Sequence, residues 1–187
     1  MTGAPPGRAA PSVIVVMGPA GAGKSTVGRA LAESLGWRFH DADDFHAAAS
    51  VERMRRGEPL LDADRAPWLA ALRALIASEL GAAARDAVGG AGAVLACSAL
   101  SRAHRAALLP PEAPAGAVRF AYLRATPATL RARLEHRPGH FAPAALLASQ
   151  LATLEEPDAA EDAIVVDGER PVGEAVAMLA RALLPGR

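Results

Sequence analysis

The sequence predicts a single α/β domain of three layers, in which helices cover both faces of a five-stranded parallel sheet. Five short runs of β-branched and other apolar residues alternate with segments whose apolar residues recur at helical spacing. The connections between these runs are long enough for the crossovers that parallel pairing requires. The chain has 187 residues, a length that suits one domain. We expect residues 1–11 to form a disordered tail and residues 12–187 to form the domain.

Charge and composition limit the partners of this domain. Twenty Lys and Arg residues balance twenty Asp and Glu residues, so no overall field favours nucleic acid or an anionic membrane surface. The first residues lack the apolar core of a signal peptide, and no apolar run is long enough to span a bilayer. Cys97 is the only cysteine, which excludes a disulfide within the chain and suits a reducing compartment. We therefore expect a cytoplasmic protein.

The first element, a buried strand over residues 13–17, leads into a phosphate-binding loop. Residues 18–26 read GPAGAGKST and fit the pattern G-x-x-x-x-G-K-S/T, and an apolar-faced helix follows over residues 27–35. Backbone N–H groups and the helix N-terminus both favour an anion here. Lys24 is expected to reach the β- and γ-phosphates of ATP, and the Ser25 hydroxyl to ligate Mg²⁺. The predicted nucleotide-binding residues are Gly18, Ala20, Gly21, Ala22, Gly23, Lys24, Ser25 and Thr26.

Lys24 is also the only lysine in the chain. Every other basic position except histidine is arginine, so the one compact ammonium stands where it fits between phosphates and a planar guanidinium does not. This favours a phosphate site over a chance glycine-rich turn.

Acidic residues follow the second strand, predicted over residues 37–40. The carboxyl ends of parallel strands share one edge of a sheet, so these acids should emerge beside the phosphate loop. In an extended segment Asp41 and Asp43 would point the same way. Asp41 would hold a water bound to Mg²⁺, and Asp43 would accept a proton or hydrogen bond from a substrate hydroxyl. A solvated acidic turn that caps the next helix is the alternative.

A short helix is predicted over residues 50–56 and a long one over residues 62–84. Arg65 lies in the first turn of the long helix, where the helix dipole disfavours a cation. An anionic substrate would explain this position, and so would a surface ion pair with Asp62 or Asp64. Both explanations stay open.

The third strand, predicted over residues 93–97, ends at Ser98 without an acidic residue. Many P-loop NTPases place their metal-binding acid there, so its absence assigns that role to Asp41. A later run, residues 164–167, ends in an aspartate but is interpreted as an ordinary fifth strand.

The second half of the chain alternates in the same way. A helix is predicted over residues 101–109, a strand over 118–123, and a helix that begins at Thr126 and Pro127 with a good cap. That helix carries three arginines, which would repel one another unless an anion lies between them. They are typical of a lid that closes on a transferring phosphoryl group, although a solvated basic surface is the alternative. Helices over residues 144–154 and 171–184 complete the pattern.

Together, several motifs resemble the successive signatures of gluconokinases of the P-loop, shikimate-kinase-like type. They lie at residues 17–26, 36–37, 41–46, 62–69, 97–100, 137–141, 150 and 153–155. The resemblance covers nearly all of residues 13–184. It implies ATP-dependent phosphorylation of D-gluconate at the 6-hydroxyl, giving 6-phospho-D-gluconate and ADP. It also implies an adenylate-kinase-like P-loop kinase fold with an arginine-bearing lid, and a homodimer.

A sugar-acid substrate suits the polar residues of these motifs. Its carboxylate calls for arginine and its hydroxyls for hydrogen-bonding side chains. The residues expected to bind substrate are Asp43, His46, Arg65, Ser98, Arg105 and His140. The residues expected to act in catalysis are Lys24, Asp43, Arg133 and Arg137, with Ser25 and Asp41 at the metal. A shikimate or nucleoside-monophosphate kinase, and a nucleotide-binding regulator without turnover, are the alternatives.

Overall fold

The predicted α/β architecture is confirmed in a computed structural model, which describes residues 10–56, 58, 60–86, 90–136 and 144–183. Five strands form one parallel sheet in the order β2-β3-β1-β4-β5. The strands are β1 (Val13–Met17), β2 (Arg38–Asp41), β3 (Ala93–Cys97), β4 (Val118–Arg124) and β5 (Ile164–Asp167). Because β1 is central, the loop that follows it leaves the middle of the sheet edge, where ligands bind in such folds.

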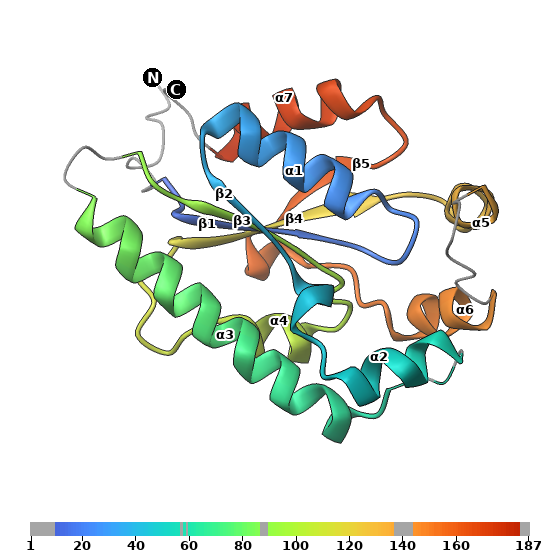
Figure 1. Ribbon diagram of the computed structural model, residues 1–187. Coiled ribbons are helices and arrows are strands. Elements are labelled where there is room, and N and C mark those ends of the chain that lie inside the picture. The colour runs from blue at the N-terminus through green and yellow to red at the C-terminus, as the bar shows by residue number, and fades with distance from the viewer. Residues whose placement is uncertain (1–9, 57, 59, 87–89, 137–143, 184–187) are drawn as a thin grey trace.

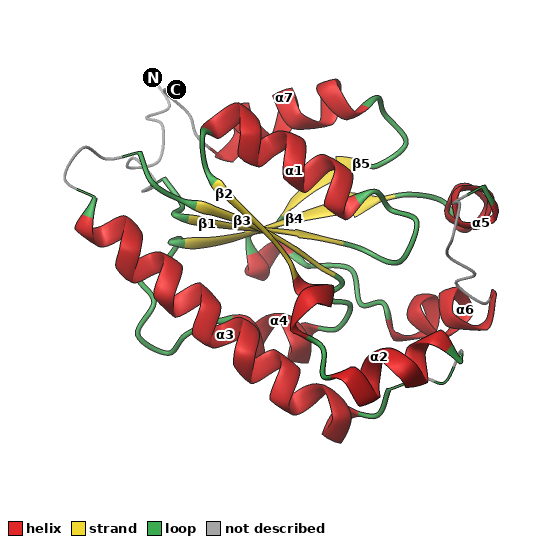
Figure 2. Cartoon of the chain, viewed as in Figure 1, coloured by secondary structure: helices red, strands yellow, loops and turns green. Residues whose placement is uncertain are grey.

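Helices cover both faces of this sheet (Figure 1). Helices α1 (Lys24–Leu35) and α7 (Val172–Leu183) pack together on one face, and α3 (Asp62–Arg85) and α4 (Arg102–Leu108) cover the other. The remaining helices gather beyond the carboxyl ends of the strands, at the right in Figure 2. They are α2 (Ala48–Arg55), α5 (Pro127–Glu135) and α6 (Ala144–Thr153), with the 3₁₀ turn η1 (Ala42–Phe45). A second 3₁₀ turn, η2 (Ala159–Glu161), comes just before β5.

Alternation along β1 produces two cores. Ile14 and Val16 pack in the cluster under α1 and α7, whereas Val13, Val15 and Met17 pack in the cluster under α3 and α4. All five side chains are buried, so β1 appears in sequence as a continuous apolar run, as expected for a strand covered on both faces. Burying such a side chain stabilises a fold by about 1.5–3 kcal/mol. The phosphate loop is therefore anchored on a fully buried strand.

Glycines delimit α1 as the sequence predicts. Gly23, at φ 92°, precedes the helix, and Gly36, at φ 67°, ends it. Both values lie in the left-handed region that glycine adopts without steric cost. Within the described ranges, none of the helices combines the length and apolarity that crossing a bilayer demands.

Candidate active site

A cavity of about 530 Å³ lies at the carboxyl ends of the central strands. The phosphate loop after β1 and Asp41 at the end of β2 form one part of its lining, and Ser98 after β3 lies between the strands and α4. Helices α2 to α6 and the η1 turn supply most of the rest. The sheet thus brings together residues that are widely separated in the chain.

Most of the predicted nucleotide-binding residues line this cavity, namely Ala20, Gly21, Gly23, Lys24, Ser25 and Thr26. Gly18 and Ala22 do not line it, and the Ala22 side chain is buried. Gly21 is required by geometry: its φ is 83°, and an added Cβ would lie 2.7 Å from a backbone oxygen of α5. The loop therefore packs directly against that helix.

Two side chains of the loop have defined partners in the cavity. Lys24 Nζ donates to the Pro19 carbonyl oxygen at 3.0 Å, across the loop. Ser25 Oγ donates to Asp41 Oδ2 at 2.6 Å. The structure thus pairs the two residues predicted to bind Mg²⁺, although they come from different elements.

The Ser25–Asp41 pair fits a magnesium site of the kind that also uses substrate phosphates. A hydroxyl and a carboxylate are hard oxygen donors, and Mg²⁺ commonly takes one or two protein ligands with phosphate oxygens and water. No group of three His, Cys, Asp or Glu side chains suited to a metal occurs among the described residues. The protein side chains would therefore supply only part of the coordination shell.

The predicted extended geometry of Asp41 and Asp43 is wrong in one respect. Ala42–Phe45 forms a 3₁₀ turn, and Asp41 caps it by accepting the backbone N–H of Asp43 at Oδ1, 3.2 Å away. The short Asp side chain captures a local N–H and so competes with extended structure. Both carboxylates nevertheless line the cavity, and Asp43 is exposed to it.

His46 lies against the indole of Trp68 in the same cavity. The rings stack with centroids 4.5 Å apart and an interplanar angle of 7°, and Trp68 Nε1 donates to the Ala42 carbonyl oxygen at 2.8 Å. Burial lowers the pKa of His46, a nearby Asp43 opposes this shift and Arg65 adds to it. His46 Nδ1 is buried without a hydrogen-bond partner among the described residues. The ring is thus held as a neutral imidazole at neutral pH.

Arg65 lines the cavity from the first turn of α3. Asp64, one of the surface partners considered for it, accepts a hydrogen bond from Arg53 Nη1 at 2.6 Å and one from the Leu61 N–H at 2.9 Å, and it also interacts electrostatically with Arg65. The charges of Asp43 and Arg65 both act on His46, so these three residues lie near one another in the cavity.

Of the predicted lid arginines, Arg133 is described and lines the cavity. Its Nη1 donates to the Gly168 carbonyl oxygen at 2.9 Å and more weakly to that of Gly21 at 3.4 Å. This places the guanidinium over the phosphate loop. Arg137 and His140 lie outside the described residues.

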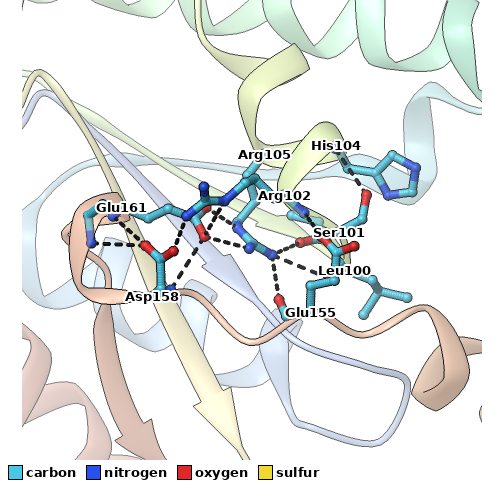
Figure 3. A network of polar contacts seen from close by, with 10 residues as sticks. Leu100, Ser101, Arg102, His104, Arg105, Glu155, Asp158 and Glu161 are labelled. Carbon is cyan, nitrogen blue, oxygen red and sulfur yellow. Dashed lines mark hydrogen bonds and ion pairs between the residues drawn. The ribbon is translucent and has the colours of Figure 1, made fainter.

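The prediction that Arg105 contacts substrate is wrong, because its guanidinium is buried and does not line the cavity. It lies instead in the polar network of Figure 3. Arg105 is 1% exposed and binds Glu161 through Nε at 2.5 Å and Nη2 at 2.7 Å. Its Nη1 donates to the carbonyl oxygens of Ala99, Leu100 and Glu155 at 3.2, 3.4 and 2.9 Å. The positive charge of Arg105 suggested that it binds the substrate carboxylate. The carboxylate that it binds is that of Glu161, 56 residues away in the sequence.

The sequence did not predict that residues of α6 line the cavity. Leu146, Ser149, Gln150 and Thr153 all line the cavity, and Gln150 Oε1 accepts the Ala20 backbone N–H at 2.6 Å. Gln150 and Thr153 are among the residues that carry the family resemblance, but the sequence assigned neither of them a role in the site. His104 and Trp68 also line the cavity without having been predicted as site residues.

Comparison with known proteins assigns the family. A family model described as AAA domain matches residues 13–157. A gluconokinase of Gluconobacter oxydans is 46% identical over 86% of this chain and 84% of that protein. A probable gluconokinase of Xenopus tropicalis is 40% identical over 86% of this chain and 87% of that protein.

Solved structures agree with these relatives. A gluconokinase from Sinorhizobium meliloti superposes with a TM-score of 0.77 at 40% identity, covering 92% of this chain and 94% of that one. A shikimate kinase from Acinetobacter baumannii, at 20% identity and a TM-score of 0.57 over 95% of each chain, shares the fold. The matches at 40–46% identity extend over most of both chains, and the phosphate loop of this chain lines its cavity. This chain therefore belongs to the gluconokinase family.

Proposed function

We propose that this protein transfers the γ-phosphoryl group of ATP to the 6-hydroxyl of D-gluconate, giving 6-phospho-D-gluconate and ADP. The observation that carries the proposal is a single cavity with two chemically distinct sides. The phosphate loop with Lys24 and Ser25 forms the donor side, and Asp43, His46 and Arg65 form the acceptor side. A sugar acid presents a carboxylate and a row of hydroxyls, which these acceptor-side groups match.

On the donor side, the backbone of the loop and the Lys24 ammonium bind the phosphates. Ser25 and Asp41 would hold Mg²⁺, which would supply positive charge to offset the negative charge that develops on the transferring phosphoryl group. Arg133, bonded to Gly21 of the loop and to Gly168 after β5, adds a fixed cation. Such groups lower the barrier because they are oriented before the charge moves.

On the acceptor side, Arg65 pairs with the gluconate carboxylate and the neutral His46 ring hydrogen-bonds to hydroxyl groups. The stack on Trp68 fixes the plane of that ring. Ser98 also lines the cavity and supplies one more hydroxyl. Asp43 orients the 6-hydroxyl toward the phosphoryl group.

Transfer breaks the bond between the γ-phosphorus and the β–γ bridging oxygen and forms a bond from that phosphorus to O6 of gluconate. The proton of the 6-hydroxyl passes to the Asp43 carboxylate, and ADP leaves. The transition state of such a transfer is loose, so the position of Asp43 matters more than its basicity.

An acceptor screen with coupled ADP release tests this proposal. ADP release should be fast with D-gluconate and slow with shikimate, gluconate epimers or nucleoside monophosphates. Rapid turnover on one of those other acceptors, or ATP binding without turnover on any of them, would contradict it.

Asp43→Asn tests the acceptor-side assignment. The substitution should lower kcat/KM for gluconate by about 10²-fold or more, the range typical of a positioned acid or base. Asp44→Asn is a matched control, because Asp44 is exposed in the same turn and does not line the cavity. A kcat/KM of Asp43→Asn within a few-fold of wild type would remove Asp43 from the mechanism.

A homodimer, a cytoplasmic location and a domain that spans residues 12–187 are further parts of the proposal. The buried, unpaired thiol of Cys97 supports a reducing compartment. Light scattering during size-exclusion chromatography tests the dimer, for which a mass near 38 kDa is expected as twice the 19.1 kDa of the chain.

A further inference from the structure

Helix α6 is joined to the phosphate loop by a hydrogen bond that the proposed mechanism has not used. Gln150 Oε1 accepts the backbone N–H of Ala20 at 2.6 Å, and the contact is partly buried. Both residues line the cavity. In the phosphate loop, backbone N–H groups are the elements that bind anions. A side chain that engages one of them therefore acts on the binding machinery itself.

The same peptide unit also bonds to Lys24. The Ala20 N–H and the Pro19 carbonyl belong to one planar group, and the Pro19 oxygen accepts from Lys24 Nζ at 3.0 Å. Gln150 therefore holds one side of this peptide and Lys24 the other. Because the peptide is rigid, rotating it to release Gln150 also moves the acceptor that orients the ammonium.

The other end of α6 is fixed to the core. The N–H of Glu155 donates to the Leu100 carbonyl oxygen at 2.8 Å, and the buried Arg105 donates to the Glu155 carbonyl oxygen at 2.9 Å (Figure 3). Leu147, one helical turn before Leu151, packs in the core under α1. Gln150 is thus presented to the loop from a supported helix.

The contact between the Pro19–Ala20 peptide and Lys24 indicates which phosphate Gln150 affects. The Pro19–Ala20 peptide contacts Lys24, the residue that reaches the β- and γ-phosphates, and Ala20 and Gln150 share the cavity with Asp43 on the acceptor side. The γ-phosphoryl must lie between the loop and the acceptor hydroxyl in order to be transferred. Because the Pro19–Ala20 peptide bonds to Lys24, its release should weaken binding of the γ-phosphoryl more than binding of the rest of the nucleotide.

We propose that Gln150 is a positioning residue for the γ-phosphoryl, which sets the orientation of the Lys24 ammonium through the Pro19–Ala20 peptide. This inference rests on the proposed kinase function and adds a residue to it. A neutral amide suits the role, because it accepts the Ala20 N–H without placing a negative charge beside the triphosphate.

The test compares the wild type with Gln150→Met, which has similar length but no amide oxygen. The Mg²⁺ complexes of ADP and of a non-hydrolysable ATP analogue are titrated calorimetrically without acceptor. We expect the Kd for the ATP analogue to rise about tenfold, which corresponds to the loss of one hydrogen bond. The Kd for ADP should change less than about twofold, and kcat should fall about tenfold with the gluconate KM nearly unchanged.

Ala148→Met is the matched control, since Ala148 is an exposed position of the same helix. It should leave both Kd values and kcat at the wild-type level. Thermal melts of all three proteins define a temperature at which each is folded for the titrations.

The ratio of the two Kd values decides the outcome. A purely structural role for Gln150 lowers the affinities for ADP and the ATP analogue equally, and either that result or two unchanged affinities overturns the proposal. The titrations need no acceptor. If the wild type fails to phosphorylate gluconate, the proposed function is lost while the role of Gln150 is still decided by this ratio.

Discussion

Replacing Arg105 with methionine removes the guanidinium at the centre of the network in Figure 3 while keeping much of the apolar side chain. The change leaves the Glu161 carboxylate without its two-point partner and removes a donor from the carbonyl oxygens of Ala99, Leu100 and Glu155. If Arg105 supports the fold, stability falls and substrate affinity hardly changes. If Arg105 binds the substrate carboxylate, substrate affinity falls and stability hardly changes.

The burial of both partners sets the expected size of the effect. Arg105 is 1% exposed, and the Glu161 side chain is 15% exposed. Removing one partner of a buried pair costs about 3–5 kcal/mol, and the lower end applies because Glu161 keeps some contact with water. At about 2–4 °C for each kcal/mol in a domain of this size, Tm should fall by about 6–12 °C.

Urea and thermal unfolding measure this loss, and steady-state kinetics at a temperature where the variant is folded measure the gluconate KM. We expect KM to change by less than about threefold, since Arg105 does not line the cavity. Arg102→Met is the control: Arg102 is in the same network, bound to Asp158, but is 56% exposed. That variant should lose less than about 1 kcal/mol. A Tm for Arg105→Met within about 2 °C of wild type, with a strongly raised KM, would refute the reasoning.

Three further outcomes are expected. Lys24→Arg keeps the charge but should lower kcat by about 10²-fold or more, because a planar guanidinium does not fit between the phosphates; coupled ADP release measures it, and near-normal turnover would contradict the argument from the single lysine. Gly21→Ala should destabilise the fold by about 1–3 kcal/mol in urea melts, since φ is 83° and the new Cβ meets a backbone oxygen of α5 at 2.7 Å. The pKa of Glu161 is lowered below its ordinary 4.5, mainly by hydrogen bonding from Arg105. The stability that this carboxylate contributes is therefore complete above pH 4.5 and is lost as the pH falls through its pKa in the folded state. Urea midpoints measured at decreasing pH below 4.5 should therefore fall more steeply for wild type than for Arg105→Met, and parallel curves would contradict this linkage.

The sequence was most informative where structure depends on local pattern. The apolar run at β1, the glycines around α1 and the Thr126–Pro127 start of α5 each predict an element, because periodicity, left-handed turns and capping act within a few residues. The donor half of the site followed for the same reason, since the phosphate loop is one continuous segment.

The rest of the site was harder to predict because its geometry depends on distant or competing partners. Asp41 was expected in an extended segment, but its side chain bonds to the N–H of Asp43 and forms a turn. Arg105 was expected to bind the substrate carboxylate, but its partner is Glu161, 56 residues away in the sequence. Gln150 reaches Ala20 across 130 residues. Such contacts depend on the tertiary packing of α4 and α6, for which no local pattern exists.

The buried thiol at the end of β3 makes this sheet accessible to chemical kinetics. Burial raises the pKa of Cys97 to about 12, and the thiolate is the form that reacts. A maleimide should therefore label only molecules in which β3 has opened. Nucleotide at about 100 times its Kd stabilises the native state by about 2.7 kcal/mol and should slow labelling about hundredfold. The lone thiol thus turns each opening of the sheet into a covalent event that can be counted, and nucleotide affinity follows from labelling rates alone.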